Sequence, residues 1–314
     1  MSEIKKQFAI AVDLGGTHLR VAIVSMDGKI VKKSMIKTPR EGDDERIVSR
    51  MMIGMIQNFI KEADGEVIGI GVSAAGPIDV DDGVVTNHNM GFARIPIVEP
   101  LMDVFDQPIS FLNDTNAAVL AEYTFGAGKC CRNVIYLTIS SGIGAGIIMD
   151  GNLLLGRSGN AGEVGHMNVN TSYEIECGCK KGHAHWEGIA SGRNIPRFYK
   201  VWSEKEKVAD VSFHTCQTQP IYDAAKEGDE IAQKFIDVIG KVNARGISNL
   251  IVAYDPEIIV LGGAVVVHNE KEVLTSIKNN IDHYLPTLPK IVVTKLGDDV
   301  SLIGAAAAVF EKTL

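Results

Sequence analysis

The chain has 314 residues, of which 46% are hydrophobic and 22% are charged, the composition of a folded protein of about two domains. A net charge of -8 without clustered Lys and Arg disfavours a nucleic-acid binder. The first apolar run, residues 8–12, ends at Asp13 and is too short for a signal or membrane segment. Five cysteines, an odd number with closely spaced pairs, do not indicate a disulfide framework. We therefore expect a cytoplasmic protein with no nucleic-acid or membrane partner.

The amino-terminal stretch "FAIAVDLGGTHLRVAIVSMDGKIVKKS" predicts a strand, a glycine turn, a strand, an Asp27-Gly28 turn and a third strand. Residues 133–156, "NVIYLTISSGIGAGIIMDGNLLLG", repeat this order. Two copies of one unit predict a duplicated, two-domain architecture.

Between the copies, strands alternate with helices. Residues 43–63 predict an amphipathic helix that buries Ile47, Met51, Met55 and Phe59. "VIGIGVSAAGPID" reads as a buried strand that runs into a glycine loop, and "PISFLND" as a strand followed by the helix "TNAAVLAEYTFG". This alternation predicts the α/β class.

The carboxyl-terminal part continues the alternation. A long helix is predicted up to Asp255-Pro256, "EIIVLGG" reads as a buried strand, and "SLIGAAAAVFEKTL" as a terminal helix.

Three glycine turns follow directly after predicted strands. They are Gly15-Gly16-Thr17, the run from Ser141 and Gly142 through Gly144 to Gly146, and Gly262-Gly263. Glycine lets backbone N–H groups approach phosphate oxygens, although each turn taken singly is also explained by a tight hairpin. Neither a Walker sequence nor the dinucleotide pattern G-x-G-x-x-G is present, so the commonest nucleotide folds are disfavoured.

The stretch "CGCKKGHAHWEG", residues 177–188, gathers two cysteines, two histidines and a glutamate. Thiolate and imidazole are ligands that zinc prefers. The alternative for Cys177 and Cys179 is a pair of buried reduced thiols.

The order of the three turns resembles the phosphate-1, phosphate-2 and adenosine segments of the sugar kinase, Hsp70 and actin superfamily. Within it, "GEVGHMNV" and "CGCKKGHAHWEGIASG" resemble the signature of the ROK family (repressors, open reading frames, kinases), and the likeness runs from about residue 8 to residue 308. This resemblance implies a two-domain ribonuclease H-like (actin-like ATPase) fold with a cleft between the domains. Residues 1–112 plus about 301–314 would form the smaller domain, and 113–300 the larger one with the zinc site.

The resemblance also implies site residues. Asp114 matches the catalytic base, for which a carboxylate is suited, although a helix N-cap is its alternative role. The implied sugar contacts, beside Asp114 itself, are Asn89, Asn113, Glu163, His166 and Glu187. Away from the family, Asn89 reads as a turn residue. The implied ATP and phosphate contacts are Asp13, Gly15, Gly16, Thr17, Ser141, Gly142, Gly144, Gly262 and Gly263, with Asp13 orienting Mg²⁺ through water.

The implied zinc ligands are His166, Cys177, Cys179 and a fourth residue where the chain departs from the family pattern. His185 stands two positions before Glu187, as the family's last ligand does, and is preferred over His183. Four protein ligands fill the zinc tetrahedron, so such a site is structural.

The implied function is an ATP-dependent kinase of the 6-hydroxyl of a hexose, with glucose as the first choice. Alternatives are an N-acetylmannosamine or N-acetylglucosamine kinase, a non-catalytic sugar sensor, and a sugar-responsive repressor. The repressors carry a helix-turn-helix domain before the first glycine turn, where about a dozen residues precede Asp13 here. Family members usually form homodimers.

Overall fold

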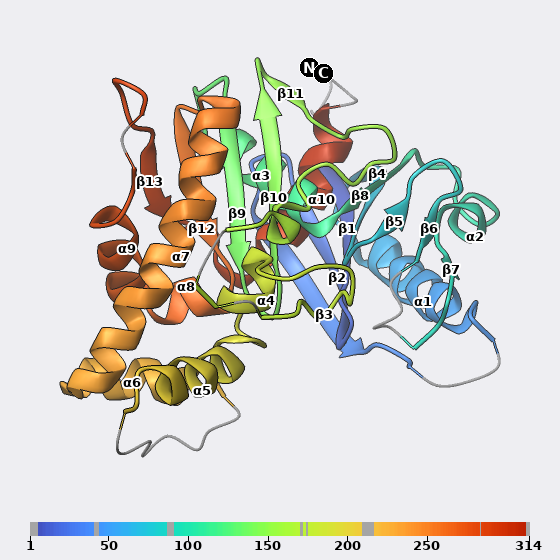
Figure 1. Cartoon of the computed structure of the whole chain (residues 1–314). Helices are drawn as coiled ribbons and strands as arrows, with labels where there is room; N and C mark the ends of the chain where they lie inside the picture. The colour runs from blue at the N-terminus through green and yellow to red at the C-terminus, as the bar shows by residue number, and fades with distance from the viewer. Residues whose placement is uncertain are drawn as a thin grey trace.

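The computed structural model describes residues 6–40, 44–86, 91–169, 172–173, 175–208, 217–282 and 284–311. Two five-stranded sheets dominate this part of the chain, and a small three-stranded sheet lies beside the first (Figure 1). None of the helices in these ranges is long and apolar enough to cross a lipid bilayer.

The N-terminal sheet has the strand order β3-β2-β1-β4-β8. Its strands are β1 (Gln7–Leu14), β2 (His18–Ser25), β3 (Ile30–Lys37), β4 (Glu66–Ala74) and β8 (Ile109–Asn113). The first three form an antiparallel meander, while β1, β4 and β8 run parallel. The carboxyl ends of the three parallel strands therefore meet at one edge of the sheet.

The C-terminal sheet has the matching order β11-β10-β9-β12-β13. Its strands are β9 (Val134–Ile139), β10 (Ile143–Met149), β11 (Asn152–Leu153), β12 (Ile258–Gly262) and β13 (Lys290–Val293). The antiparallel and parallel pairings repeat those of the first sheet. The predicted duplication is confirmed, because both sheets carry one topology.

Helix α1 (Ile47–Glu62) covers one face of the N-terminal sheet, and the predicted buried face is correct at Phe59, partly buried at Ile47 and Met55, and wrong at Met51. The residues it buries are Val48, Ser49, Met52, Ile56 and Phe59, whereas Met51 is exposed. A step of four residues drifts around a helix with 3.6 residues per turn, so two neighbouring stripes fit one sequence pattern. Packing of Val48, Met52 and Ile56 into the sheet selects the other stripe.

Helices α3 (Asp114–Thr124) and α10 (Val300–Glu311) pack against each other between the two sheets (Figure 1). α10 packs on β1 and β4, and α3 packs on β9 and β10. A Cβ added at Gly304 of α10 would collide with the carbonyl oxygen of Ala117 in α3, so this close approach needs glycine. The predicted domain division stays a prediction, although α10 does lie on the N-terminal sheet.

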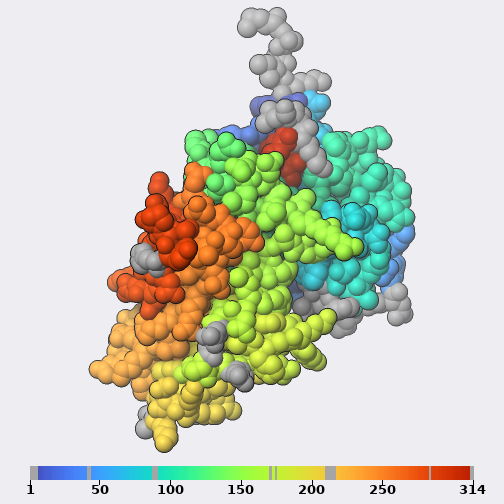
Figure 2. Space-filling model, turned by 45° about the horizontal axis from the view of Figure 1, so that its top comes forward, coloured from blue at the N-terminus to red at the C-terminus, as the bar shows by residue number. Residues whose placement is uncertain are grey.

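The remaining elements flank these layers. The small sheet contains β5 (Ile78–Asp79), β6 (Val84–Val85) and β7 (Ile95–Pro96), and α2 (Val98–Met102) follows it. The C-terminal sheet is covered on its other face by helices that share one large apolar core, seen in yellow and orange in Figure 2. These helices are α4 (Trp186–Ala190), α5 (Ile195–Lys205), α6 (Gln219–Glu227), α7 (Glu230–Tyr254), α8 (Ala264–His268) and α9 (Glu270–Lys278). Short 3₁₀ turns lie at Val164–His166 and Gly297–Asp299.

Candidate functional site

Asp114 lies where β8 ends and α3 begins, at the carboxyl edge of the N-terminal sheet. The helix N-cap is Asn113, whose Oδ1 accepts the backbone N–H of Asn116 at 2.8 Å. The alternative role of Asp114 as the N-cap is therefore wrong. Its Oδ1 accepts the adjacent N–H of Thr115 at 2.8 Å.

The environment of Asp114 disfavours its charged form. Burial, with the negative charge of Asp13 and a smaller effect of Glu163, raises the pKa of Asp114 to about 7, against the opposing hydrogen bond from Thr115. A carboxylate that titrates near neutral pH is suited to accept a proton from an alcohol, because general bases work best with a pKa near the working pH.

Asp13 is almost fully buried, and a neighbouring arginine occupies one of its oxygens. Oδ2 of Asp13 accepts Nη2–H of Arg20 at 2.7 Å and Nε–H at 3.0 Å, and Oδ1 accepts the hydroxyl of Ser73 at 3.2 Å. Arg20 also donates to the carbonyl of Asp298 at 2.7 Å. Arg20 was not predicted as a site residue, although a hairpin centred on Gly16-Thr17 places residue 20 opposite residue 13.

The first glycine turn, Gly15-Gly16-Thr17, joins β1 to β2. The side chain of Arg40, which was not predicted as a site residue, lies beside it. The turn closes through the N–H of Gly15, which donates to the carbonyl of His18 at 2.9 Å. Nε–H of Arg40 donates to the carbonyl of Gly16 at 2.6 Å, and Nη2 lies 3.4 Å from Oγ1 of Thr17. A positive charge therefore lies beside the turn predicted to bind phosphate.

The second turn joins β9 to β10 and is shorter than predicted. It closes at Ser140, whose N–H donates to the carbonyl of Gly142 at 2.9 Å, so Ser141 and Gly142 lie in the turn. Gly144 was placed in this turn and instead lies within β10, where an added Cβ would be 3.3 Å from Cγ2 of Thr115. The packing of α3 explains that glycine without a phosphate.

The third turn lies beside the second. Gly262 ends β12, and Gly263 has a φ of 87°, which favours glycine. An added Cβ at Gly263 would be 2.6 Å from Oγ1 of Thr138, near the end of β9. Parallel pairing of β12 with β9 thus brings these two turns to one edge of the C-terminal sheet.

Predicted sugar contacts from both halves of the chain lie near one another. A Cβ added at Gly76 would lie 3.5 Å from Nδ2 of Asn113 and 3.7 Å from Oε1 of Glu163, so the three residues border one space. Oε2 of Glu163 is 3.8 Å from Nε2 of His166. Asn89 lies outside the described residues, and its role stays a prediction.

Glu187 connects this group to the second turn. It lies in the first turn of α4, and its Oε2 accepts the N–H of Ile143 at 2.9 Å. A Cβ added at Gly142 would lie 2.6 Å from the same oxygen, so glycine makes room for the carboxylate.

The four predicted zinc ligands lie together. One ligand atom from each of His166, Cys177, Cys179 and His185 lies within 4.8 Å of the other three, and the group does not include His183. Sγ of Cys179 is 3.5 Å from Nδ1 of His185. Tetrahedral zinc, with bonds of about 2.3 Å to sulfur and about 2.0 Å to nitrogen, puts these two atoms about 3.5 Å apart. Burial and the nearby His166 lower the pKa of His185, which favours the neutral, metal-binding imidazole. The donor set therefore fits a closed, structural zinc site.

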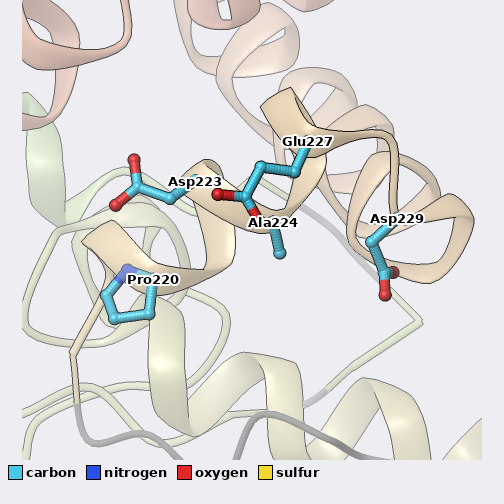
Figure 3. A pocket seen from close by; sticks show the side chains of 5 residues that line it. All are labelled: Pro220, Asp223, Ala224, Glu227 and Asp229. Atoms are coloured by element: carbon cyan, nitrogen blue, oxygen red, sulfur yellow. The ribbon is translucent and has the colours of Figure 1, made fainter.

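Two surface hollows lie away from all these residues. One, of about 450 Å³, is lined by Pro220, Asp223, Ala224, Glu227 and Asp229, whose carboxylates point in different directions (Figure 3). The other, of about 750 Å³, lies along α5 and α7. Three carboxylates repel phosphate, so the first hollow is not suited to a nucleotide.

Comparison with known proteins identifies the family of the chain. The chain is 32% identical over 304 residues to a glucokinase of Pyrobaculum calidifontis, covering 96% of this chain and 95% of that one. It is 30% identical over 306 residues to an N-acetylmannosamine kinase of Haemophilus influenzae, covering 95% and 93%. A ROK family glucokinase from Streptomyces griseus, solved in complex with glucose and AMPPNP, superposes with a TM-score of 0.75 at 28% identity, covering 95% of this chain and 98% of that one. The ROK family model matches residues 9–312. The chain therefore belongs to the ROK family, and its fold is the two-domain, actin-like fold of the ROK sugar kinases.

Proposed function

We propose that this protein is an ATP-dependent kinase that phosphorylates the 6-hydroxyl of a hexose, with glucose as the first candidate. The observation that carries the proposal is Asp114, a carboxyl with a pKa of about 7 at the strand edge where Asn113 and Glu163 meet. Relatives named glucokinase at 30–32% identity over nearly the whole chain support it.

In this proposal Asp114 accepts the proton of the attacking hydroxyl, while Asn113, Glu163, His166 and Glu187 bind the other hydroxyls of the sugar. Each hydroxyl both donates and accepts, which matches a set of amide, carboxylate and imidazole groups.

The glycine turns would bind the phosphates. Backbone N–H groups of Gly16 and Thr17 and of Ser141 and Gly142 would hold the phosphate oxygens, since the N–H of Gly15 already donates to the carbonyl of His18. Arg40 would stabilise charge that develops during transfer. Mg²⁺ arrives with ATP and neutralises phosphate charge. Asp13 would orient its water ligands through Oδ1, because Arg20 occupies Oδ2. For Gly144 the position inside β10 favours a packing role over a phosphate contact.

A structural zinc held by His166, Cys177, Cys179 and His185 completes the proposal. The metal would fix the segment that carries Glu187, two positions after His185, and would hold His166 beside Glu163. A cytoplasmic location and a homodimer stay predictions from the sequence.

A second candidate substrate follows from the comparisons. A relative named N-acetylmannosamine kinase is 30% identical over 95% of this chain, so an N-acetylhexosamine is the alternative acceptor.

The test is ADP release from Mg-ATP with glucose, mannose, fructose, N-acetylglucosamine and N-acetylmannosamine, with Asp114→Asn beside the unmodified protein. Turnover of a hexose that stops in the variant supports the proposal. Binding of a sugar without turnover would replace it with the sensor function, and the absence of both would contradict both.

A further inference from the structure

A loop of the C-terminal half, between β11 and Val164–His166, reaches across to the N-terminal half. Its residue Asn160 makes two hydrogen bonds with one backbone residue: Oδ1 accepts the N–H of Ile78 at 3.2 Å, and Nδ2–H donates to the carbonyl of Ile78 at 2.9 Å. The lime-coloured part of the chain lies against the cyan part in Figure 2.

Ile78 offers these two groups because it lies at a sheet edge. β5 is the outer strand of the β5-β6-β7 sheet and pairs with β6 on one side only. The N–H and C=O of Ile78 bind the amide of Asn160, which acts in place of the next strand. Water would satisfy the same groups if the two segments separated, so the contact is reversible at a small free-energy cost.

Both residues of this contact are close in sequence to residues of the proposed hexose site. Ile78 stands two positions after Gly76, and Asn160 stands three positions before Glu163. Gly76 and Glu163 in turn face each other across the space that Asn113 borders. The contact between Asn160 and Ile78 therefore lies within three positions of both residues that border this space.

Close packing holds the loop in this position. Nδ2 of Asn116, in the buried part of α3, is 3.4 Å from the carbonyl of Gly159. Gly159 has a φ of 77°, and an added Cβ would collide with Cγ2 of Val80. Gly159 occupies a position that only glycine fits, and it thus places the next residue, Asn160, beside β5.

We propose that Asn160 is a positioning residue that closes the hexose site across the two halves of the chain by pairing with the backbone of Ile78. This inference rests on the proposed kinase function. The pairing holds Gly76 and Glu163 at the spacing that the hexose needs, and it re-forms each time a sugar binds.

The first test compares Asn160→Ala with Asn152→Ala. Asn152 is a matched control because it is an exposed residue of β11 whose side chain donates to the carbonyl of Asp150, two positions away. We expect Asn160→Ala to raise the KM for the hexose roughly tenfold, the effect of one to two lost hydrogen bonds. The KM for ATP should stay as in the unmodified protein, and Asn152→Ala should change neither. An unchanged hexose KM in Asn160→Ala, or an equal rise in both KM values, would overturn the inference.

The second test needs no sugar turnover and shows whether the variant is folded. Hydrogen exchange at the amide of Ile78 should be faster in Asn160→Ala than in the unmodified protein, while amides of β1 and β9 exchange as before. Added hexose should slow exchange in residues 75–79 and 156–163 together in the unmodified protein. Protection of one segment without the other would contradict closure.

The two proposals fail in different ways. A hexose that the unmodified protein phosphorylates, with the same KM in Asn160→Ala, leaves the kinase function intact and removes the role of Asn160. If the unmodified protein neither binds nor phosphorylates a hexose, the proposed function falls and this inference falls with it, whatever the exchange at Ile78.

Discussion

Oε2 of Glu187 accepts the backbone N–H of Ile143 at 2.9 Å. Glu187 follows His185 of the proposed zinc site by two positions, and Ile143 directly follows the second glycine turn. One carboxylate therefore joins the metal-ligating segment to a turn predicted to bind phosphate. If zinc binds as proposed, loss of the metal should therefore disturb this turn through Glu187.

Replacing Glu187 should separate its two roles. In Glu187→Gln the side-chain oxygen can still accept the N–H of Ile143, so we expect nearly unchanged thermal stability with a raised KM for the hexose. Glu187→Ala leaves that N–H without its partner, which costs about 1–3 kcal/mol of unfolding free energy. Thermal unfolding and steady-state kinetics of both variants check this, and equal loss of stability in the two would argue against the bond.

The raised pKa of Asp114 predicts a pH dependence of activity. A general base must be ionised, so kcat/KM for the hexose should rise with pH and level off above about 7. Asp114→Asn should lower kcat roughly a hundredfold or more and remove this inflection. A rate that falls through the same pH range would contradict the assignment of the base.

The same pKa predicts that Asp114 reduces the stability of the folded protein at high pH. Its folded pKa of about 7 lies above the usual value of 3.8, so folding favours the protonated form. The resulting stabilisation is complete below about pH 4 and is lost as the pH rises through 7. Asp114→Asn should therefore raise the melting temperature most at pH 8 and least at pH 4, measured by calorimetry without ligands.

Arg40 should matter for phosphoryl transfer. Its guanidinium lies at the first glycine turn, where Nε–H donates to the carbonyl of Gly16. We expect Arg40→Met to lower kcat by about tenfold to a thousandfold, as for other groups that stabilise charge in the transition state. Arg46→Met is the matched control, because Arg46 forms an exposed ion pair with Glu99 at 3.2 Å. Equal kinetics for both variants would exclude a role for Arg40.

The metal site gives a prediction of stoichiometry. Elemental analysis should find one zinc ion per chain in the unmodified protein and in His183→Ala, and little zinc in His185→Ala. Of these two histidines, His185 belongs to the group of four ligands and His183 does not. Loss of zinc should lower kcat/KM and loosen residues 177–187, measured by hydrogen exchange. Zinc retained in His185→Ala but lost in His183→Ala would reverse the choice between the two histidines.

Much of the architecture could be predicted because local patterns encode it. Buried strands that end at glycine turns, such as β1 before Gly15, combine an apolar run with a residue that allows the turn, and both signals lie within a few residues. The long helix α7 ends where Asp255-Pro256 was expected to stop it, since proline cannot continue a helix. The buried stripe of α1 was predicted only in part, because sequence periodicity leaves a rotation about the helix axis undetermined.

Part of the site could not be predicted, because its contacts join residues far apart in the chain. The clustered thiols and imidazoles of residues 177–185 predict a zinc site from their residue types, whereas the predicted role of Asp114 as a base depends on the family resemblance, because a carboxylate at the start of a helix also fits an N-cap. The contacts of Arg40 with Gly16, of Glu187 with Ile143 and of Asn160 with Ile78 depend on how two sheets and their loops are brought together. Local propensities specify each strand and helix, whereas the burial of both sheets against α3 and α10 sets these long-range distances.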